Sequence, residues 1–153
     1  MERSTIRNLL AVCCLALSLP ATVEAQVPGG GAVPAALLGE FVDDYGIHYA
    51  VSKEQWSQGE YARYEIAEWN VEDRFLIVRN GTKNRTEAGL WTRIDWILLP
   101  GGADFQWAFC YAVYDAESAQ AARLSPSSDR DTPRTGCNGF PFSRMQRTSA
   151  PQR

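Results

Sequence analysis

The sequence predicts a mainly β fold: an antiparallel meander of about six strands, forming a small barrel or a curved sheet, with a short C-terminal helix. Apolar and polar side chains alternate with a period of two through much of residues 37–124. Turn-forming residues separate the alternating runs at the short spacings of a meander. Closure would remove both unpaired edge strands, but the sequence leaves open whether the sheet closes.

Each alternating run is predicted to be one strand with an apolar and a polar face. The six runs are 40–44, 47–52, 63–67, 75–79, 90–98 and 105–113. Their connections are rich in Gly, Asn, Asp, Ser and Pro, and fall at 57–59, 70–73, 80–88 and 100–102. In the fifth run, the predicted core face carries Leu90, Ile94, Trp96 and Leu98.

The helix is predicted over residues 116–123, which are alanine-rich and lack β-branched side chains. Asp115 precedes this run and is the expected N-cap. Pro126 follows it and prevents its continuation. The alanine face of the helix needs a partner, for which a sheet or a barrel mouth is the natural surface.

The first 25 residues are predicted to be a signal peptide. Arg3 and Arg7 precede an apolar stretch over 9–19, and residues 23–25 offer the small-residue pattern that signal peptidase cuts. Cleavage before Gln26 would leave a flexible, Gly- and Pro-rich lead-in (26–36), one β-rich domain (37–142) and a basic tail (143–153). Lipidation of Cys13 or Cys14 is the weaker alternative, because the residues before each are not small.

Removal of the leader would leave two cysteines, Cys110 and Cys137, and therefore only one intramolecular pairing. An exported chain favours a disulfide between them. Two separated cysteines and the single His48 do not make a zinc-binding set. We therefore expect a structural disulfide and no metal or other cofactor.

Composition narrows the partner classes. The chain has 153 residues, is 45% hydrophobic and carries a formal net charge of −3, which argues against broad binding to nucleic acid. After the leader, no stretch reaches the length of apolar sequence that a transmembrane helix needs. Residues 37–124 are net acidic, whereas 125–153 are net basic. The basic tail is expected either to be solvated or to dock on the acidic body.

Four strings together resemble a recurrent small exported bacterial module of uncharacterised function. They are Gly39–Gly46 (GEFVDDYG), Leu90–Trp96 (LWTRIDW), Cys110–Ala116 (CYAVYDA) and Gly136–Phe142 (GCNGFPF). The resemblance covers residues 38–145 and implies bacterial export and a Cys110–Cys137 pair. It transfers no catalytic residue. A looser likeness to lipocalin-type barrels rests on the leader, the meander and the terminal helix, and serves as analogy only.

The run 90–98 carries the candidate ligand site. Arg93 and Asp95 are two residues apart and project from one face, together with Trp91. Such a set could line a pocket in which Arg93 holds an anionic group and Trp91 stacks on it. The alternative is a structural ion pair that helps to fix the strand register.

A catalytic interpretation rests on carboxylates. Glu65 and Glu68 with His48 could form a hydrolase site, provided that the fold brings them into one concavity. Asp43 and Asp44 are adjacent, and we expect them to initiate a turn instead of forming a catalytic pair. No catalytic residue is therefore assigned.

The sequence thus favours an exported, non-enzymatic binding or interaction module of the bacterial envelope or exterior, periplasmic or secreted. Its expected partner is a small molecule or an envelope component. The alternatives are a carboxylate-dependent hydrolase and a structural component whose basic tail contacts an anionic surface.

Overall fold

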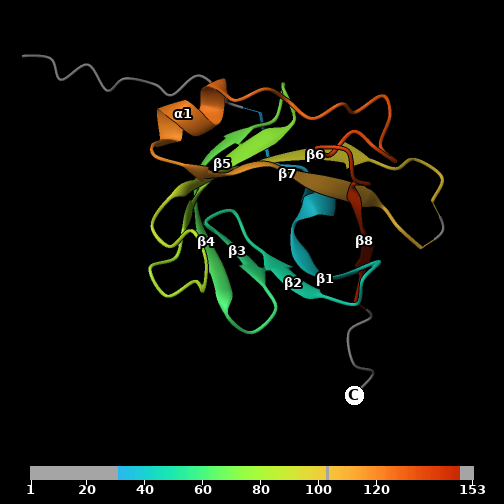
Figure 1. Ribbon diagram of the computed structural model, residues 1–153. Coiled ribbons are helices and arrows are strands. Elements are labelled where there is room, and N and C mark those ends of the chain that lie inside the picture. Colours follow the sequence, from blue (N-terminus) through green and yellow to red (C-terminus); the bar gives the residue numbers. More distant parts are fainter. Residues whose placement is uncertain (1–30, 103, 149–153) are drawn as a thin grey trace, which may run out of the picture.

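The chain folds into a closed antiparallel barrel of eight strands (Figure 1). The structure is a computed structural model that describes residues 31–102 and 104–148. In chain order the elements are the 3-10 helix η1 (Ala35–Leu37), β1 (Gly39–Asp43), β2 (His48–Val51), β3 (Gln55–Gln58), β4 (Ala62–Asn70), β5 (Phe75–Asn80), β6 (Trp91–Leu98), β7 (Trp107–Ala116), α1 (Ala119–Leu124) and β8 (Ser143–Arg147). The predicted signal peptide lies outside the described residues.

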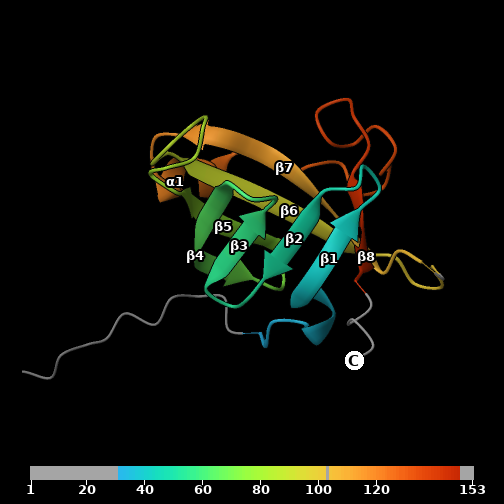
Figure 2. The same cartoon turned by 90° about the horizontal axis from the view of Figure 1, so that it is seen from below.

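Every strand pairs with the next one along the chain, and β8 pairs with β1 to close the ring. Figure 2 shows β4, β3, β2 and β1 side by side in front of β5, β6 and β7. The predicted mainly β meander is confirmed, and the open question of closure is answered in favour of a barrel. The wall has eight strands where the sequence predicted about six.

The two additional strands are β3 and β8. In β3 only Trp56 is buried, and two of its four residues fall within the predicted turn 57–59. In β8 only Met145 is buried, and the strand lies in the segment predicted to be a basic tail. Both strands are short and mostly polar, so the period-two signal is weak in them. The folded domain therefore extends past residue 142 to Arg147.

The barrel interior is filled by side chains, many of them aromatic. Trp56, Trp107, Phe41 and Phe109 are almost completely buried and pack edge to face, with ring centroids 5.0–6.0 Å apart in the closest of these pairs. Leu37 of η1 joins the same core. Eight strands enclose a space that side chains can just fill. The interior is consequently a packed core.

Helix α1 lies on the outside of the barrel, where it contacts β5, β6 and β7 (Figure 1). It buries Ala122 against Phe75 and Ile77. The prediction of Asp115 as the N-cap is wrong, because β7 continues to Ala116, which pairs with Trp91. Ser118 caps the helix instead, and its side chain accepts a hydrogen bond from the Ala121 N–H at 3.1 Å. None of the described helices is long and apolar enough to cross a membrane.

Residues 125–142 connect α1 to β8 across the outside of β6 and β7, and we call them the C-terminal strap (Figure 1). A disulfide joins Cys137 of the strap to Cys110 of β7, with an S–S distance of 2.02 Å. The predicted pairing is thus confirmed. Beside the disulfide, Phe142 packs on Ile97 and Ala108 in a second apolar cluster on the outer wall. Leu98, predicted to face the core, is 48% exposed because β6 ends there.

Candidate functional site

Arg93 and Asp95 lie on the outer face of β6, on the same side of the strand as the sequence predicted. Arg93 Nε donates to Asp95 Oδ1 at 2.8 Å. The two residues are only 6% and 0% exposed, because α1 and the strap cover them. Trp91, half-buried, packs in the neighbouring cluster under α1.

The polar atoms of this pair are engaged by the chain itself. Asp95 Oδ2 accepts from the Ser128 backbone N–H at 2.6 Å, and Arg130 Nη2 lies 3.3 Å from Asp95 Oδ1. Arg93 Nη1 donates to the carbonyl oxygens of Arg123 and Ser125, both at 3.0 Å. These carbonyls belong to the end of α1, where a cation is favoured by the helix dipole. The geometry therefore makes the pair an anchor for α1 and the strap, and its predicted ligand-binding role remains a prediction.

The carboxylates considered for hydrolysis have separate surroundings. Glu68 is bonded to Arg123 of α1, with Arg123 Nε donating to Oε2 at 2.9 Å. Glu65 is exposed on β4, and His48 is exposed on β2. Asp43 forms the expected turn, accepting from the N–H groups of Tyr45 and Ile47, and also from Tyr49 Oη at 3.0 Å. Among the described residues, no group of three or more His, Cys, Asp and Glu side chains is placed to hold a metal ion.

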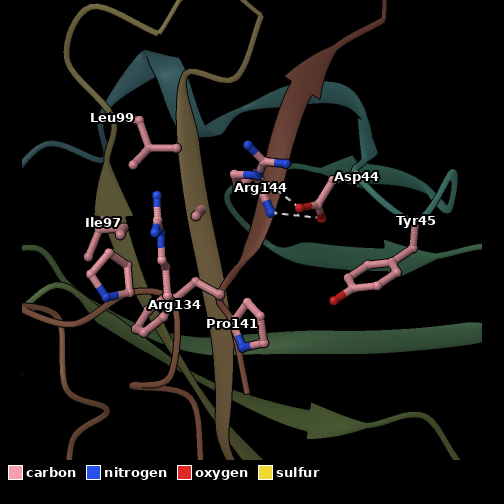
Figure 3. A pocket seen from close by; sticks show the side chains of 10 residues that line it. Asp44, Tyr45, Ile97, Leu99, Arg134, Pro141 and Arg144 are labelled. Carbon is pink, nitrogen blue, oxygen red and sulfur yellow. Dashed lines mark hydrogen bonds and ion pairs between the residues drawn. The ribbon is translucent and has the colours of Figure 1, made fainter. Parts of the chain in front are cut away.

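A pocket of about 420 Å³ opens on the outer wall of the barrel, and we call it the outer-wall pocket (Figure 3). It lies where the β1–β2 turn, the ends of β6 and β7, the strap and β8 meet. Its lining consists of Asp44, Tyr45, Ile97, Leu99, Ala108, Pro133, Arg134, Pro141, Phe142 and Arg144. The pocket is thus built from segments about one hundred residues apart in the sequence.

The floor and walls of the outer-wall pocket are apolar. Ile97, Ala108 and Phe142 are buried and belong to the cluster beside the disulfide, and Leu99 packs against them. Pro133 and Pro141 come from the strap and complete the wall. The floor therefore belongs to the covalently cross-linked part of the fold.

The rim of the pocket carries charge. Arg144 is held by Asp44: Nε donates to Oδ2 at 2.9 Å, and the Arg144 backbone N–H donates to Oδ1 at 3.2 Å. Its guanidinium also lies over the Phe105 ring, 4.5 Å from the centroid. Arg134 extends into the pocket beside Ile97 (Figure 3) and takes part in none of the hydrogen bonds or ion pairs among the described residues. The Arg144 guanidinium is therefore held in place by Asp44, whereas the Arg134 guanidinium is free to bind a ligand.

Sequence reasoning missed the outer-wall pocket because its residues do not form a motif. Arg134 lies in the segment after the predicted helix, and Arg144 lies in the predicted tail. The one available signal was the string GCNGFPF, in which a cysteine, a proline and an aromatic residue follow each other closely. A disulfide at Cys137 requires this string to lie on the barrel.

Three tyrosines form a polar cluster inside the barrel. Tyr111 Oη accepts from Trp56 Nε1 at 3.2 Å and donates to Gln58 Oε1 at 3.0 Å. Burial raises the pKa of Tyr111, Tyr49 and Tyr64, and the neighbouring Asp43 carboxylate raises that of Tyr49 further. The cluster ties β3 to β7 across the interior.

Comparison with known proteins gives no relative for this chain: no protein-family model, curated protein or solved structure matches it. The class that the structure itself defines is a closed eight-stranded antiparallel barrel with a packed interior, a disulfide-linked strap and a pocket on the outer wall.

Proposed function

We propose that this chain is an exported, non-enzymatic binding module that takes a small molecule in the outer-wall pocket. The observation that carries the proposal is a cavity of about 420 Å³ with an apolar floor and a charged rim. Small-molecule sites are commonly cavities of about 300–1,000 Å³, mainly apolar, with a few polar groups that orient the ligand.

The ionisable groups of the pocket favour binding over catalysis. Its lining contains one carboxylate, Asp44, which is already paired with Arg144. A guanidinium stays protonated in proteins and does not serve as a base. Glycosidase-type hydrolysis needs two carboxyl groups facing one bond, and the lining supplies only one. The carboxylate-dependent hydrolase is accordingly the weaker proposal.

The pocket is also held in shape before any ligand arrives. The disulfide fixes the strap at Cys137, and Asp95 fixes it again at Ser128. Because the walls are already formed, the protein loses less conformational entropy when a ligand binds. This rigidity supports a binding role.

Binding is tested with N-phenylnaphthylamine, a neutral apolar dye whose fluorescence rises in apolar surroundings. We expect saturable binding of one dye per chain. Leu99→Asn, which makes the floor polar, is expected to weaken binding about tenfold, because it removes apolar contact and adds an unpaired amide. Leu98→Asn is the matched control, since Leu98 precedes Leu99 and lies outside the lining. Absence of saturable binding to the wild-type protein would contradict the proposal.

Export rests on the leader pattern and is supported by the disulfide, which forms and persists in oxidising compartments. Expression of the full chain in a bacterium, followed by fractionation and intact-mass measurement, tests it. We expect a periplasmic or secreted product that begins at Gln26. A full-length cytoplasmic product would contradict export without affecting the pocket.

A further inference from the structure

We infer that the ligand of the outer-wall pocket is an apolar molecule with one anionic group, which Arg134 binds at the rim while the apolar part rests on the floor. The inference rests on the proposed binding function and names the ligand class. A carboxylate, a sulfonate and a phosphate ester share the required chemistry.

The charge of the lining points to an anion. Asp44 contributes one negative charge, and Arg134 and Arg144 contribute two positive charges, so the pocket carries a net charge of +1. The whole chain has a formal net charge of −3. The pocket is therefore a local positive site on a negatively charged protein, which favours one anionic group and disfavours a cation.

The two arginines have different roles. Asp44 engages the Nε edge and the backbone N–H of Arg144, which fixes this residue against β1 and leaves its Nη groups without a bond among the described residues. Among the described residues, no Asp or Glu side chain forms an ion pair with Arg134. A guanidinium presents a planar set of donors that matches the oxygens of a carboxylate, sulfonate or phosphate. Arg134 is therefore the pocket arginine whose charge no carboxylate among the described residues offsets, and the ligand anion pairs with it.

The apolar part of the ligand follows from the floor. Ile97, Ala108 and Phe142 are buried at its base, and Leu99 lies beside them. In Figure 3 the Arg134 side chain lies beside Ile97, so charge and apolar surface are adjacent. An ion without an apolar part would leave the floor uncovered, and a neutral apolar molecule would leave Arg134 unpaired.

The test compares N-phenylnaphthylamine with anilinonaphthalenesulfonate, which has the same ring skeleton and one added sulfonate. We expect the sulfonate dye to bind the folded wild-type protein about tenfold more tightly than the neutral dye. This difference in affinity should become smaller as the salt concentration is raised. Arg134→Gln should abolish the preference while leaving the neutral dye bound as before. Arg134→Lys should restore part of it, and Arg79→Gln, an exposed arginine on β5 outside the lining, should retain all of it.

The outcomes separate the two claims. If the neutral dye does not bind, the proposed binding function fails. If both dyes bind equally well, or if the preference survives in Arg134→Gln, the binding function stands and the anionic ligand class is overturned.

Discussion

Arg93 Nε donates to Asp95 Oδ1 at 2.8 Å, and this ion pair is sealed between the barrel wall and the segment that follows β7. Arg93 also bonds to the end of α1, and Asp95 bonds to the strap at Ser128. Two residues on one strand thus hold both outer elements. The outer-wall pocket depends on this arrangement because the strap supplies much of its wall.

Asp95→Ala is expected to lower the free energy of unfolding by about 3–5 kcal/mol. The substitution leaves the Arg93 guanidinium buried without its carboxylate, and removing one partner of a buried pair costs about that much. Urea unfolding measures the change. Asp44→Ala is the comparison, because its partner Arg144 is exposed, and exposed pairs contribute about 1 kcal/mol or less. If the free energy of unfolding falls by the same amount in both variants, the buried pair stabilises the fold no more than the exposed pair does.

Replacing Cys110 and Cys137 together by serine is expected to lower the free energy of unfolding by about 3.5 kcal/mol. The bond closes a segment with a sequence separation of 27 residues, and the chain-entropy relation gives this value for such a loop. The same variant should bind N-phenylnaphthylamine more weakly, because Phe142 and the prolines of the strap lose their tether. If unfolding has the same urea midpoint with and without reductant, the disulfide does not constrain the chain as described.

Trp91→Ala is expected to reduce stability without changing dye binding. Trp91 packs in the cluster of Phe75, Ile77 and Ala122 under α1, and it is not part of the pocket lining. Loss of a partly buried aromatic side chain costs about 1–3 kcal/mol at such a site. Parallel urea and dye titrations separate the two effects. A large loss of dye affinity in a folded Trp91→Ala protein would move the ligand site back to β6, as the sequence suggested.

The stability of the barrel is expected to fall as the pH rises above about 10. Burial raises the pKa of Tyr49, Tyr64 and Tyr111 in the folded state. In the unfolded chain these phenols titrate near pH 10, so the unfolded state loses protons first. A raised folded-state pKa gives stability that is complete below the unfolded pKa and is lost at higher pH.

Urea midpoints at about pH 8 and pH 11 measure this decline. Tyr49→Phe should reduce the decline, because one titrating group is removed from the folded interior. The variant also loses the hydrogen bond to Asp43 and should be less stable by about 1 kcal/mol below about pH 10, and this difference should shrink at higher pH, where the wild-type protein loses the contribution of Tyr49. An identical pH dependence in the wild-type protein and the variant would show that Tyr49 does not titrate as its surroundings require.

The sequence was sufficient for the parts of the fold that carry a periodic signal. The faces of β6 were predicted correctly for Ile94 and Trp96 inside and for Arg93 and Asp95 outside, because alternation is strong over eight residues. The strands β3 and β8 were missed because each buries a single side chain. β3 pairs with its sequence neighbours β2 and β4, whereas the pairing of β8 with β1 depends on barrel closure, which is a property of the whole chain.

The candidate site was predictable only in part. Side-chain alternation places Arg93 and Asp95 on one face, but it does not reveal that α1 and the strap cover that face. The outer-wall pocket needs Asp44 and Arg144 to meet, one hundred residues apart, through the pairing of β1 with β8. No local pattern encodes this contact, since it arises when the last strand closes the ring.

The most direct test of the outer-wall pocket is a map of backbone amide chemical shifts during titration with anilinonaphthalenesulfonate. The largest shifts are expected at Ile97, Leu99, Ala108 and Phe142, with Arg134 at the edge of the affected region. Shifts centred instead on the barrel interior around Trp56 and Tyr111, or beside Trp91 under α1, would contradict the outer-wall site.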